Sequence, residues 1–324
     1  MTDHAAELAI QNEILERLEK LSLLYVKTEE ITTALDKIHA LRTTGFRGLG
    51  KDAYCYFVVG PTNCGKSRLF STYCQRPDAQ PEGDISPVVR VSLPSAIQNV
   101  QEFHACLLRG LGTLSFRGKH SKDQMEDRIV ERIKTREVRL VMLEETQHLL
   151  DKKSGMLGYW GADVIKELLL DRAKVPVVMS GIEVADQLFL RNSQLKSRRK
   201  GVLRLHAHDW SIPLERQRFE VAIRAFEKAA RFPKRVDLVE IGLGERIHRA
   251  TDGVIGNLCN LVEVCIAMGI RQGKEAIDQD LLAVAHASLA YTGRDWKNVF
   301  TVAVLPPIDA PDESRTTKLH KKAA

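Results

Sequence analysis

The sequence predicts an α/β protein with a parallel sheet flanked by helices, followed by a small domain made only of helices. Apolar strand-like runs alternate with helical patterns over residues 54–206, and such alternation builds a parallel sheet covered on both faces. After Trp210-Ser-Ile-Pro213 every pattern is helical. A glycine-rich turn between the first strand and the helix after it is the third observation, and it marks a strand end suited to binding an anion.

The composition is that of a globular chain with room for more than one domain. Its 324 residues are 44% hydrophobic and 28% charged, and the net charge of +6 permits contact with a polyanion without requiring it. The six cysteines include no CxxC pair, so neither a zinc site nor a disulfide framework is indicated. No apolar run approaches the roughly twenty residues that span a bilayer, and the N-terminus lacks the features of a secretion signal. We therefore expect a cytoplasmic protein.

The N-terminal residues are expected to form a helical appendage. Apolar residues recur at helical spacing over residues 8–24, and a second helical pattern follows Thr28, which suits a helix N-cap. Thr44–Gly50 contains three glycines and predicts a flexible hinge. The expected domains are the appendage over 1–45, the α/β core over 46–210, a helical lid over 211–302 and a disordered, Pro-rich tail over 303–324.

The elements of the core and of the lid follow from the apolar patterns in chain order. Unbroken apolar runs predict buried strands, and 3.6-residue spacing predicts the helices. The expected strands are Tyr54–Val59, Val88–Leu93, Val138–Leu143, Val175–Ser180 and Val202–His206. The expected helices cover residues 68–74, 100–111 and 121–134 in the core, and 214–231, 239–251, 256–272 and 278–291 in the lid.

The glycine-rich turn matches the phosphate-binding P-loop pattern at every fixed position. It begins at Gly60 and ends in Gly65-Lys66-Ser67, directly after the first strand. The glycines let backbone N–H groups face the phosphates, Lys66 supplies charge to the β and γ oxygens, and the Ser67 hydroxyl can coordinate Mg²⁺. A glycine-rich turn that binds no ligand explains less well why a strand precedes the motif and a helix follows it. The expected nucleotide-binding residues are Gly60, Pro61, Thr62, Asn63, Cys64, Gly65, Lys66, Ser67 and Arg68.

Two acids, Glu144 and Glu145, follow the third strand directly. Strand carboxyl ends of an open parallel sheet converge on the crevice that holds the P-loop, so one acid is expected to position Mg²⁺ and the other to polarise water. Taken alone, two acids at a strand end also fit a solvated edge. Ser180 at the end of the fourth strand offers a hydroxyl near the expected γ-phosphate, although a plain strand-to-turn residue fits it equally well.

A run of basic residues without any acidic residue precedes the fifth strand. Between Arg191 and His208 there is no acidic residue. A basic run is often a solvated loop, but this one also has the charge pattern of phosphate contacts, with a nucleic-acid backbone or with a neighbour's nucleotide. The candidates for DNA-backbone contacts are Lys119, Lys122, Arg191, Lys196 and Arg198 to Lys200.

Together these motifs resemble an AAA+ ATPase, and most closely the TniB/TnsC-type regulators of transposition. The segments that carry the resemblance are the P-loop, residues 138–149, residues 175–185, the stretch Gln194–Arg199 and residues 251–258. The resemblance implies binding of ATP and Mg²⁺, assembly as rings or helical filaments on double-stranded DNA, and a link between a target-selecting factor and a transposase. It further implies that Lys66 and Ser67 hold phosphate and Mg²⁺, that Glu144 stands at the place of the metal-binding acid and that Glu145 activates water. Arg198 or Arg199 would then reach a neighbouring subunit's nucleotide.

Three departures from that family pattern predict slow, switch-like hydrolysis. Glu144 stands where such ATPases usually have Asp, and its extra methylene would displace the metal-bound water. Ile182 follows the fourth strand where Thr is common, which leaves Ser180 as the hydroxyl candidate. Asn257 replaces the nucleotide-sensing arginine found in many lids.

Other functions remain open from the residues alone. A helicase loader or replication-initiator relative would share this core, and a non-hydrolysing, nucleotide-dependent scaffold would account for Glu144. GTP is disfavoured because no Asn/Thr-Lys-x-Asp base-reading motif follows the fourth strand. Cys64 in the P-loop is expected either to fill space or to be a thiolate favoured by the helix N-terminus, whose modification would block nucleotide.

Overall fold

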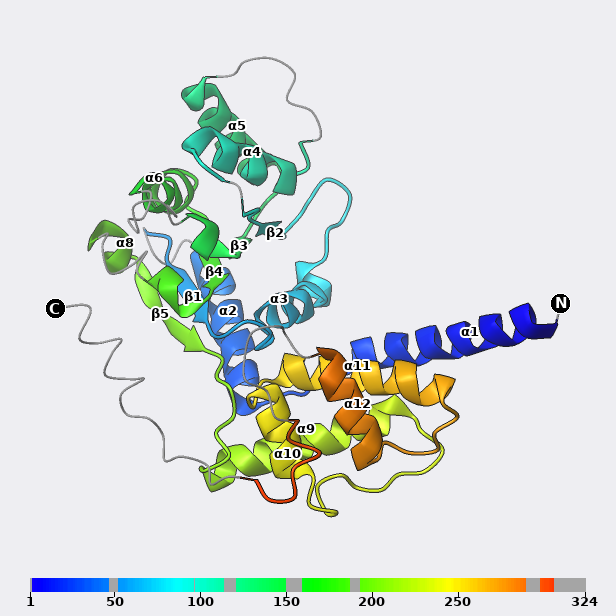
Figure 1. The fold of residues 1–324 in the computed structure, drawn as a ribbon. Helices are drawn as coiled ribbons and strands as arrows, with labels where there is room; N and C mark the ends of the chain where they lie inside the picture. Colours follow the sequence, from blue (N-terminus) through cyan, green and yellow to red (C-terminus); the bar gives the residue numbers. More distant parts are fainter. Residues whose placement is uncertain are drawn as a thin grey trace. The chain divides into compact units, whose positions relative to one another are not determined.

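The computed structural model of the chain describes residues 2–46, 52–95, 97–113, 121–149, 159–186, 193–289 and 298–305. They form two compact units (Figure 1). One is Lys27–His206, which contains the sheet, and the other combines Met1–Val26 with Ala207–Ala324 and is helical. Each unit has its own apolar core.

The structure divides the N-terminal residues 1–45 between the two units. Helix α1 (Thr2–Leu23) buries Leu21 in the core of the helical unit and lies along α11. Helix α2 (Glu29–Phe46) instead buries Ile38 and neighbouring apolar residues against the sheet. Thr28 accepts a hydrogen bond from the backbone N–H of Ile31 at 3.3 Å, as expected of an N-cap. The two helical patterns are therefore separate elements that serve different cores.

Five parallel strands form the sheet, and they lie in the order β2-β3-β4-β1-β5. Every neighbouring pair is parallel, which confirms the predicted parallel sheet. The fifth strand begins three residues earlier than expected, because the N–H of Cys55 donates to the Arg198 carbonyl and draws the basic run into the ladder. The strands are β1 (Cys55–Val59), β2 (Val88–Ser92), β3 (Leu140–Glu144), β4 (Val177–Gly181) and β5 (Arg199–Arg204).

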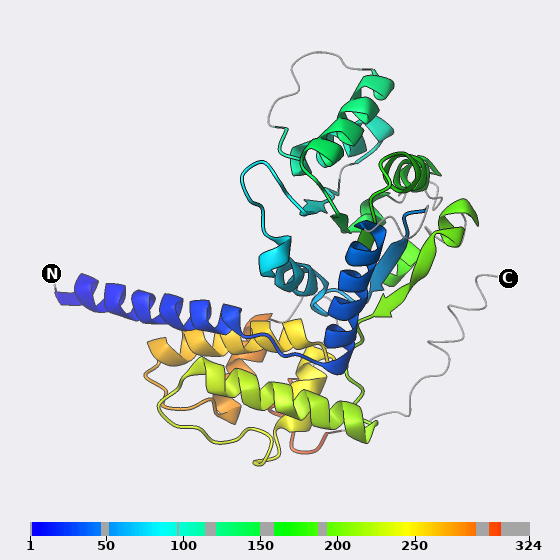
Figure 2. The ribbon, with the colours of Figure 1, turned by 180° about the vertical axis from the view of Figure 1, so that it is seen from behind.

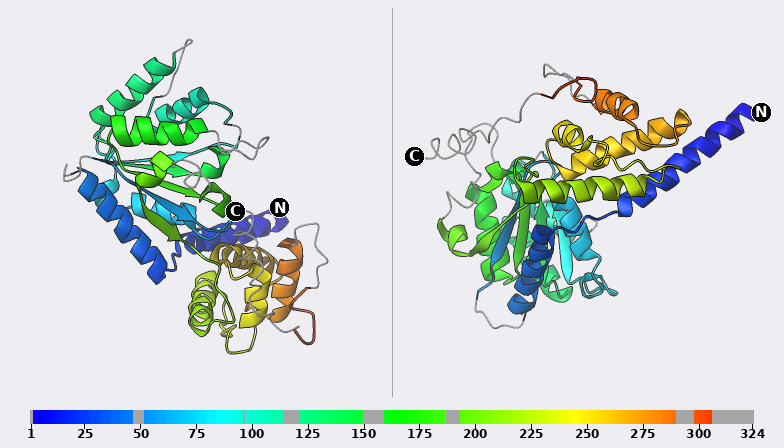
Figure 3. Two further views of the ribbon diagram at one scale, coloured as in Figure 1. Left: turned by 90° about the vertical axis from the view of Figure 1, so that its left-hand side faces the viewer. Right: turned by 90° about the horizontal axis from the view of Figure 1, so that it is seen from below.

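Different helices cover the two faces of the sheet. One face packs on α2 and α3 (Lys66–Cys74), and Figure 2 shows α2 crossing that face. The other face packs on α4 (Val100–Gly110), α5 (Lys122–Thr135) and the π-helix η3 (Val164–Arg172), as the left view of Figure 3 shows. The short elements are η1 (Pro77–Ala79), η2 (Thr146–Leu149), α6 (Tyr159–Asp163), η4 (Glu183–Asp186) and α8 (Ser193–Ser197).

The predicted core helices are confirmed, and their ends follow the expected local chemistry. Ser121 and Gln124 form a complete capping box at the start of α5, and Asn99 caps α4. Among the described residues of this unit, helix α6 with η3 is the long helical segment that the sequence analysis does not predict. Three consecutive buried leucines at 168–170 obscure the 3.6-residue spacing that would mark it as a helix.

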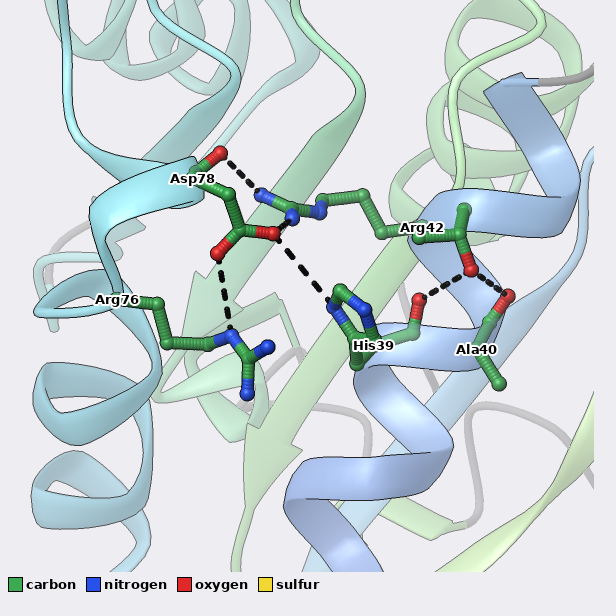
Figure 4. A network of polar contacts seen from close by, with 6 residues as sticks. His39, Ala40, Arg42, Arg76 and Asp78 are labelled. Atoms are coloured by element: carbon green, nitrogen blue, oxygen red, sulfur yellow. Dashed lines mark hydrogen bonds and ion pairs between the residues drawn. The ribbon is translucent and has the colours of Figure 1, made fainter.

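A charged network on the α2 face holds the P-loop helix in place (Figure 4). Asp78 of η1 accepts from the Arg42 guanidinium, and the Arg76 Nε donates to it at 3.2 Å. The Arg42 Nη1 also donates to the Asp78 carbonyl at 2.8 Å, and its guanidinium lies over the buried Tyr73 ring of α3. This ties α2 to the C-terminal end of α3. The predicted hinge begins inside α2, which continues to Phe46, and its remainder lies outside the described residues.

In the part of the chain that the structure describes, the helical unit is built from α1, which begins six residues before the predicted pattern, and four further helices. The bounds of these four lie within one or two residues of the prediction, except that α10 begins five residues later, because Asp237 and Gly242 turn the chain with positive φ. Asn257 donates to the Thr251 carbonyl at 3.1 Å and so holds the turn between α10 and α11. The predicted disordered tail lies outside the described residues from position 306 onward. The helices are α9 (Pro213–Ala230), α10 (Gly244–Thr251), α11 (Ile255–Arg271) and α12 (Gln279–Leu289).

Among the described residues, no single helix has the length and apolar character needed to cross a membrane. Helices α10 and α11 have that length and apolar character only when they are taken together, and the chain bends by 108° between them.

Candidate functional site

The P-loop connects β1 to α3 in a conformation that only certain residues tolerate. Gly65 has a φ of 94°, in the left-handed region that favours glycine, and it directly precedes the first turn of α3. A Cβ on Gly60 would overlap the Leu205 carbonyl oxygen and the Cys64 sulfur. The two glycines of the motif are thus needed for different reasons, one for its backbone angle and one for lack of space. The N–H groups at the start of a helix lie at the positive end of its dipole, so the start of α3 suits an anion.

Lys66 is folded back onto the loop that presents it. Its Nζ donates to the carbonyls of Gly60 at 2.8 Å and Pro61 at 2.6 Å, and the residue is 7% exposed. An ammonium has three donors and no acceptor, so incoming phosphate oxygens can replace these carbonyls as partners. The Ser67 side chain is exposed at the start of α3. These positions agree with the predicted phosphate and metal roles of the two residues, which stay predictions.

Cys64 packs beneath the loop as a small apolar residue. It is 9% exposed, and burial raises the pKa of its thiol, although the neighbouring Lys66 opposes that shift. A thiol with a raised pKa is mostly protonated at neutral pH and reacts slowly. Burial thus disfavours the thiolate, and the space-filling role of Cys64 fits this structure better than a reactive one.

Glu144 and Ser180 point to the sheet face that carries α3. Side chains alternate along a strand, and Met142 and Val178, two positions before them, are part of the core beneath α2 and α3. Glu144 is 4% exposed and Ser180 is 1% exposed. The structure therefore brings both predicted residues to the same face and the same end of the sheet as the P-loop helix.

Glu144 is paired with an arginine that the sequence analysis did not single out. The Nε of Arg90, on β2, donates to the Glu144 carboxylate. The same guanidinium donates through Nη1 to the Ser71 hydroxyl at 2.6 Å and through Nη2 to the Ser67 carbonyl at 3.4 Å. The hydrogen bond to Glu144 raises the pKa of the Arg90 guanidinium. Arg90 thereby connects the predicted metal ligand of β3 to the first turns of α3.

Glu145 leaves the strand in a strained backbone conformation. Its φ is 57°, a left-handed angle that is uncommon outside glycine and recurs at functional sites. The Gln147 side-chain amide donates to the Glu145 carboxylate, and the Gln147 Oε1 accepts from the Ile182 N–H at 3.4 Å. The buried Thr146 hydroxyl donates to the Ser180 carbonyl at 3.0 Å. The segment after β3 is thus fixed to the end of β4.

The predicted arginines of the basic run lie at the opposite end of the strands from the P-loop. Arg198 precedes β5, and its guanidinium lies 2.8 Å from Asp52 Oδ1 and 2.8 Å from Asp171 Oδ1. Arg199, the first residue of β5, is half-buried and pairs in register with Cys55. Because the strands are parallel, neither arginine can reach the P-loop of its own chain. Any contact with nucleotide would have to be made to a neighbouring subunit.

The predicted DNA-contacting lysines do not form one cluster. Lys122 begins α5, which packs with α4 towards β2, at one edge of the sheet. Lys196 of α8 and Lys200 of β5 are exposed at the other edge, where the Lys200 ammonium lies 3.9 Å from the centre of the Tyr54 ring. Lys119 and Arg191 lie outside the described residues.

Three contributors to this site were missed by sequence reasoning: Arg90, Thr146 and Gln147. Arg90 carried a usable signal, since it is the only charged residue of β2, in which it lies between buried valines. Thr146 and Gln147 directly follow the two predicted acids, but nothing local shows that they reach β4. Their roles depend on β3 and β4 being neighbours.

The residues at this site suit Mg²⁺ only together with a nucleotide. Hydroxyl and carboxylate oxygens such as those of Ser67 and Glu144 are the ligands that Mg²⁺ prefers, usually completed by phosphates and water. Within the part of the chain that the structure describes, no group of three or more His, Cys, Asp or Glu side chains could hold a metal ion by itself.

Several solved structures have a fold similar to that of this chain. The Orc1 protein of Aeropyrum pernix in complex with DNA matches with a TM-score of 0.60 at 14% identity, covering 84% of this chain and 69% of that chain. The Cdc6p of Pyrobaculum aerophilum gives 0.58 at 14% identity, with 84% and 71% covered. The Aeropyrum pernix Orc2 protein with ADPNP and ADP gives 0.57 at 16% identity, with 78% and 67% covered. These likenesses confirm the expected AAA+ fold with a C-terminal helical domain.

Sequence comparison identifies the family. No curated protein matches the chain. The family model described as bacterial TniB protein matches residues 14–205, which is more than half of the chain and includes the P-loop, both acids and the basic run. The expected resemblance is thereby confirmed, and the protein belongs to the TniB family of bacterial proteins.

Proposed function

We propose that this protein is an ATP-dependent regulator of DNA transposition that assembles on double-stranded DNA, links target selection to a transposase and hydrolyses ATP slowly. The observation that carries the nucleotide part is the grouping of Lys66, Ser67, Glu144 and Ser180 around the N-terminus of α3, with Glu145 next to them. The match to the TniB family supports the transposition part.

Each residue of the group has a chemical task in this proposal. The N–H groups at the start of α3 and the Lys66 ammonium hold the β and γ phosphates. Ser67 and Glu144 would hold Mg²⁺, which, when bound, neutralises charge that develops on the transferred phosphoryl group. Glu145 orients the attacking water and accepts its proton, and Gln147 keeps its carboxylate in place.

Two observations support slow hydrolysis. Glu144 replaces a shorter carboxylate, and its charge is already engaged by Arg90. Arg198 or Arg199 of a neighbouring subunit would complete the site, since an arginine supplied in trans is worth about 10³-fold or more in such reactions. Hydrolysis then depends on assembly, so a dispersed protein would bind ATP with little turnover.

DNA binding in this proposal is electrostatic and independent of sequence. Lys196 and Lys200 are exposed near the arginines at the start of β5, and Lys122 is exposed at the other edge of the sheet. An assembly of several subunits could line up these separate positions along a duplex. Such binding should weaken steeply with salt, because each phosphate contact releases counter-ions.

The test is to bind the full chain to random-sequence duplex DNA with ATP, with ADP and without nucleotide, while particle size is followed by light scattering. We expect large DNA-bound assemblies only with ATP. Lys66→Ala should abolish them, whereas the exposed α5 variant Lys134→Ala should not. Absence of DNA binding in every nucleotide state would overturn the DNA part of the proposal. Affinity that stays flat between low and moderate salt would overturn its electrostatic basis.

A neighbour's arginine is tested in the same assemblies. Arg198→Ala and Arg199→Ala are each compared with Asp171→Asn, which breaks an ion pair of Arg198 but keeps the arginine. A residue that acts in trans lowers hydrolysis in the assembly when replaced, while ATP affinity is unchanged. Full hydrolysis in both arginine variants would exclude this role.

A non-hydrolysing scaffold is the alternative that a specific observation favours. The ion pair between Arg90 and Glu144 engages the carboxylate that the reaction would need. Single-turnover measurement of ATP cleavage in DNA-bound assemblies separates the two functions, because a scaffold would show none.

A further inference from the structure

Arg90 joins three groups that would otherwise be independent. Its Nε reaches Glu144 at the end of β3, its Nη1 reaches the Ser71 hydroxyl, and its Nη2 reaches the Ser67 carbonyl. Ser67 and Ser71 lie one turn apart on α3, and the Ser71 hydroxyl also donates to the Ser67 carbonyl at 3.0 Å. The Glu144 carboxylate and the Ser67 backbone are therefore within the width of one guanidinium group.

That position is where a metal held by Ser67 and Glu144 would need the carboxylate. Glu144 is almost fully buried, with 5% of its side chain exposed, whereas 34% of the Arg90 side chain is exposed. A buried carboxylate next to a phosphate site repels the incoming nucleotide unless a cation is close. Arg90 is the cation that lies there in this structure.

We propose that Arg90 is a positioning residue that gives Glu144 a built-in counter-ion, so that the site binds nucleotide with little dependence on Mg²⁺. The inference rests on the proposed nucleotide-binding function and specifies its metal dependence. Arg90 also competes with the metal for Glu144, because one carboxylate cannot keep its full contact with both. Productive metal binding then requires the guanidinium to move from the carboxylate towards solvent, for which its partial exposure leaves room.

The longer acid at this position fits the same account. Arg90 and Glu144 lie on neighbouring strands, with Ser92 rather than Arg90 opposite Glu144 in the register. The arginine must reach along the strand direction, and the extra methylene of Glu144 shortens the remaining gap. The glutamate in place of the usual aspartate at position 144 and the arginine at position 90 thus favour the same contact.

The alternative is that Arg90 only holds β2 against α3. A structural pair would change thermal stability when broken, but it would not change how nucleotide affinity depends on Mg²⁺. The ratio of nucleotide dissociation constants without and with Mg²⁺ is therefore the measurement that separates the two roles.

The experiment measures binding of a fluorescent methylanthraniloyl ATP to the full chain in excess Mg²⁺ and in EDTA. In the wild-type chain the two dissociation constants should differ by less than about threefold. In Arg90→Met the ratio should rise at least about tenfold, since the uncompensated carboxylate then repels nucleotide unless Mg²⁺ is present. Arg90→Lys keeps the charge and should restore most of the wild-type ratio.

Arg139→Met is the matched control, because it also removes one arginine that contacts a glutamate near the sheet. Its side chain is 35% exposed and pairs with Glu137 just before β3, at the end of the strand away from Glu144. Its ratio should equal that of the wild type. Thermal melting of every variant shows whether it is folded. Should Arg90→Met not fold, Arg90→Gln carries the test, because it removes the charge but keeps a hydrogen-bond donor, and its ratio should rise as expected for Arg90→Met.

The outcomes are distinguishable. An unchanged ratio in Arg90→Met, with nucleotide still bound, would overturn the inference and leave the proposed function intact. A high ratio in the wild-type chain would also overturn it. Failure of the wild-type chain to bind nucleotide in either condition would overturn the proposed function, and the inference with it.

Discussion

The two ends of the same five strands differ in how their charged residues are held. At the carboxyl end, Lys66 and Glu144 are buried and bonded within the loop or to a neighbouring strand, and the backbone at Gly65 and Glu145 has left-handed angles. At the amino end, Arg198 is paired with Asp52 and Asp171 from elsewhere in the chain, in a more open setting. The carboxyl end therefore buries its charged groups, whereas the amino end holds its arginine in partly exposed ion pairs. Left-handed backbone angles do not separate the ends, since Glu137 and Lys174 have them shortly before β3 and β4.

The difference separates chemistry that one chain can carry from chemistry that needs a second chain. The carboxyl end has the P-loop motif, the acids and the buried hydroxyl of Ser180 together, so the proposed nucleotide binding would need only one chain. Arg198 and Arg199 cannot join them within that chain, because parallel strands keep the two ends apart. Four predictions test this contrast.

The largest effect is expected for Glu145→Gln at the carboxyl end. Loss of the base should lower ATP cleavage by about 10³-fold, the usual range for a general base, while nucleotide affinity stays nearly constant. Single-turnover cleavage in DNA-bound assemblies measures it. Glu131→Gln on the exposed side of α5 is the control. Equal cleavage by Glu145→Gln and wild type would assign the reaction to another group.

Lys66→Ala should lower ATP affinity by about 100-fold, since it removes charge-assisted hydrogen bonds to phosphate worth about 1.5–3 kcal/mol each. Fluorescence titration with the ATP analogue measures this loss, and Lys134→Ala should bind as the wild type does. Retained affinity in Lys66→Ala would show that the loop does not hold the phosphates.

Gly60→Ala should destabilise the chain by about 2 kcal/mol, because the added Cβ overlaps the Leu205 carbonyl at the end of β5 and the Cys64 sulfur. Thermal or urea unfolding measures the loss. The control nearer the amino end is Gly201→Ala, whose Cβ would meet only the Tyr56 ring, at 3.3 Å. A larger loss at Gly201 than at Gly60 would reverse the contrast between the two ends.

The smallest effect is expected for the ion pair between Arg198 and Asp171. With 19% and 31% of these side chains exposed, each of Arg198→Ala and Asp171→Asn should cost about 1 kcal/mol or less of unfolding free energy. The double variant should cost less than the sum of the two. Strict additivity in this cycle would show that the two residues do not stabilise each other in solution.

Much of the site could be predicted because its signals are local. The P-loop is a contiguous pattern between a strand and a helix, and the acids directly follow a buried strand. The capping residue Thr28 was recognisable for the same reason. The bounds of β5 were missed because the basic run joins the sheet only through its neighbour β1.

The sequence by itself determined the fold class, most of the elements and the identity of the phosphate-binding loop, since periodicity, caps and turns depend on residues only a few positions apart. The tertiary structure decided that Arg90 meets Glu144, that Asp52 and Asp171 hold Arg198, and that α1 and α2 serve different cores. These pairings depend on strand order and register, which bring together residues far apart in the chain. No local pattern of residues predicts the order and register of the strands.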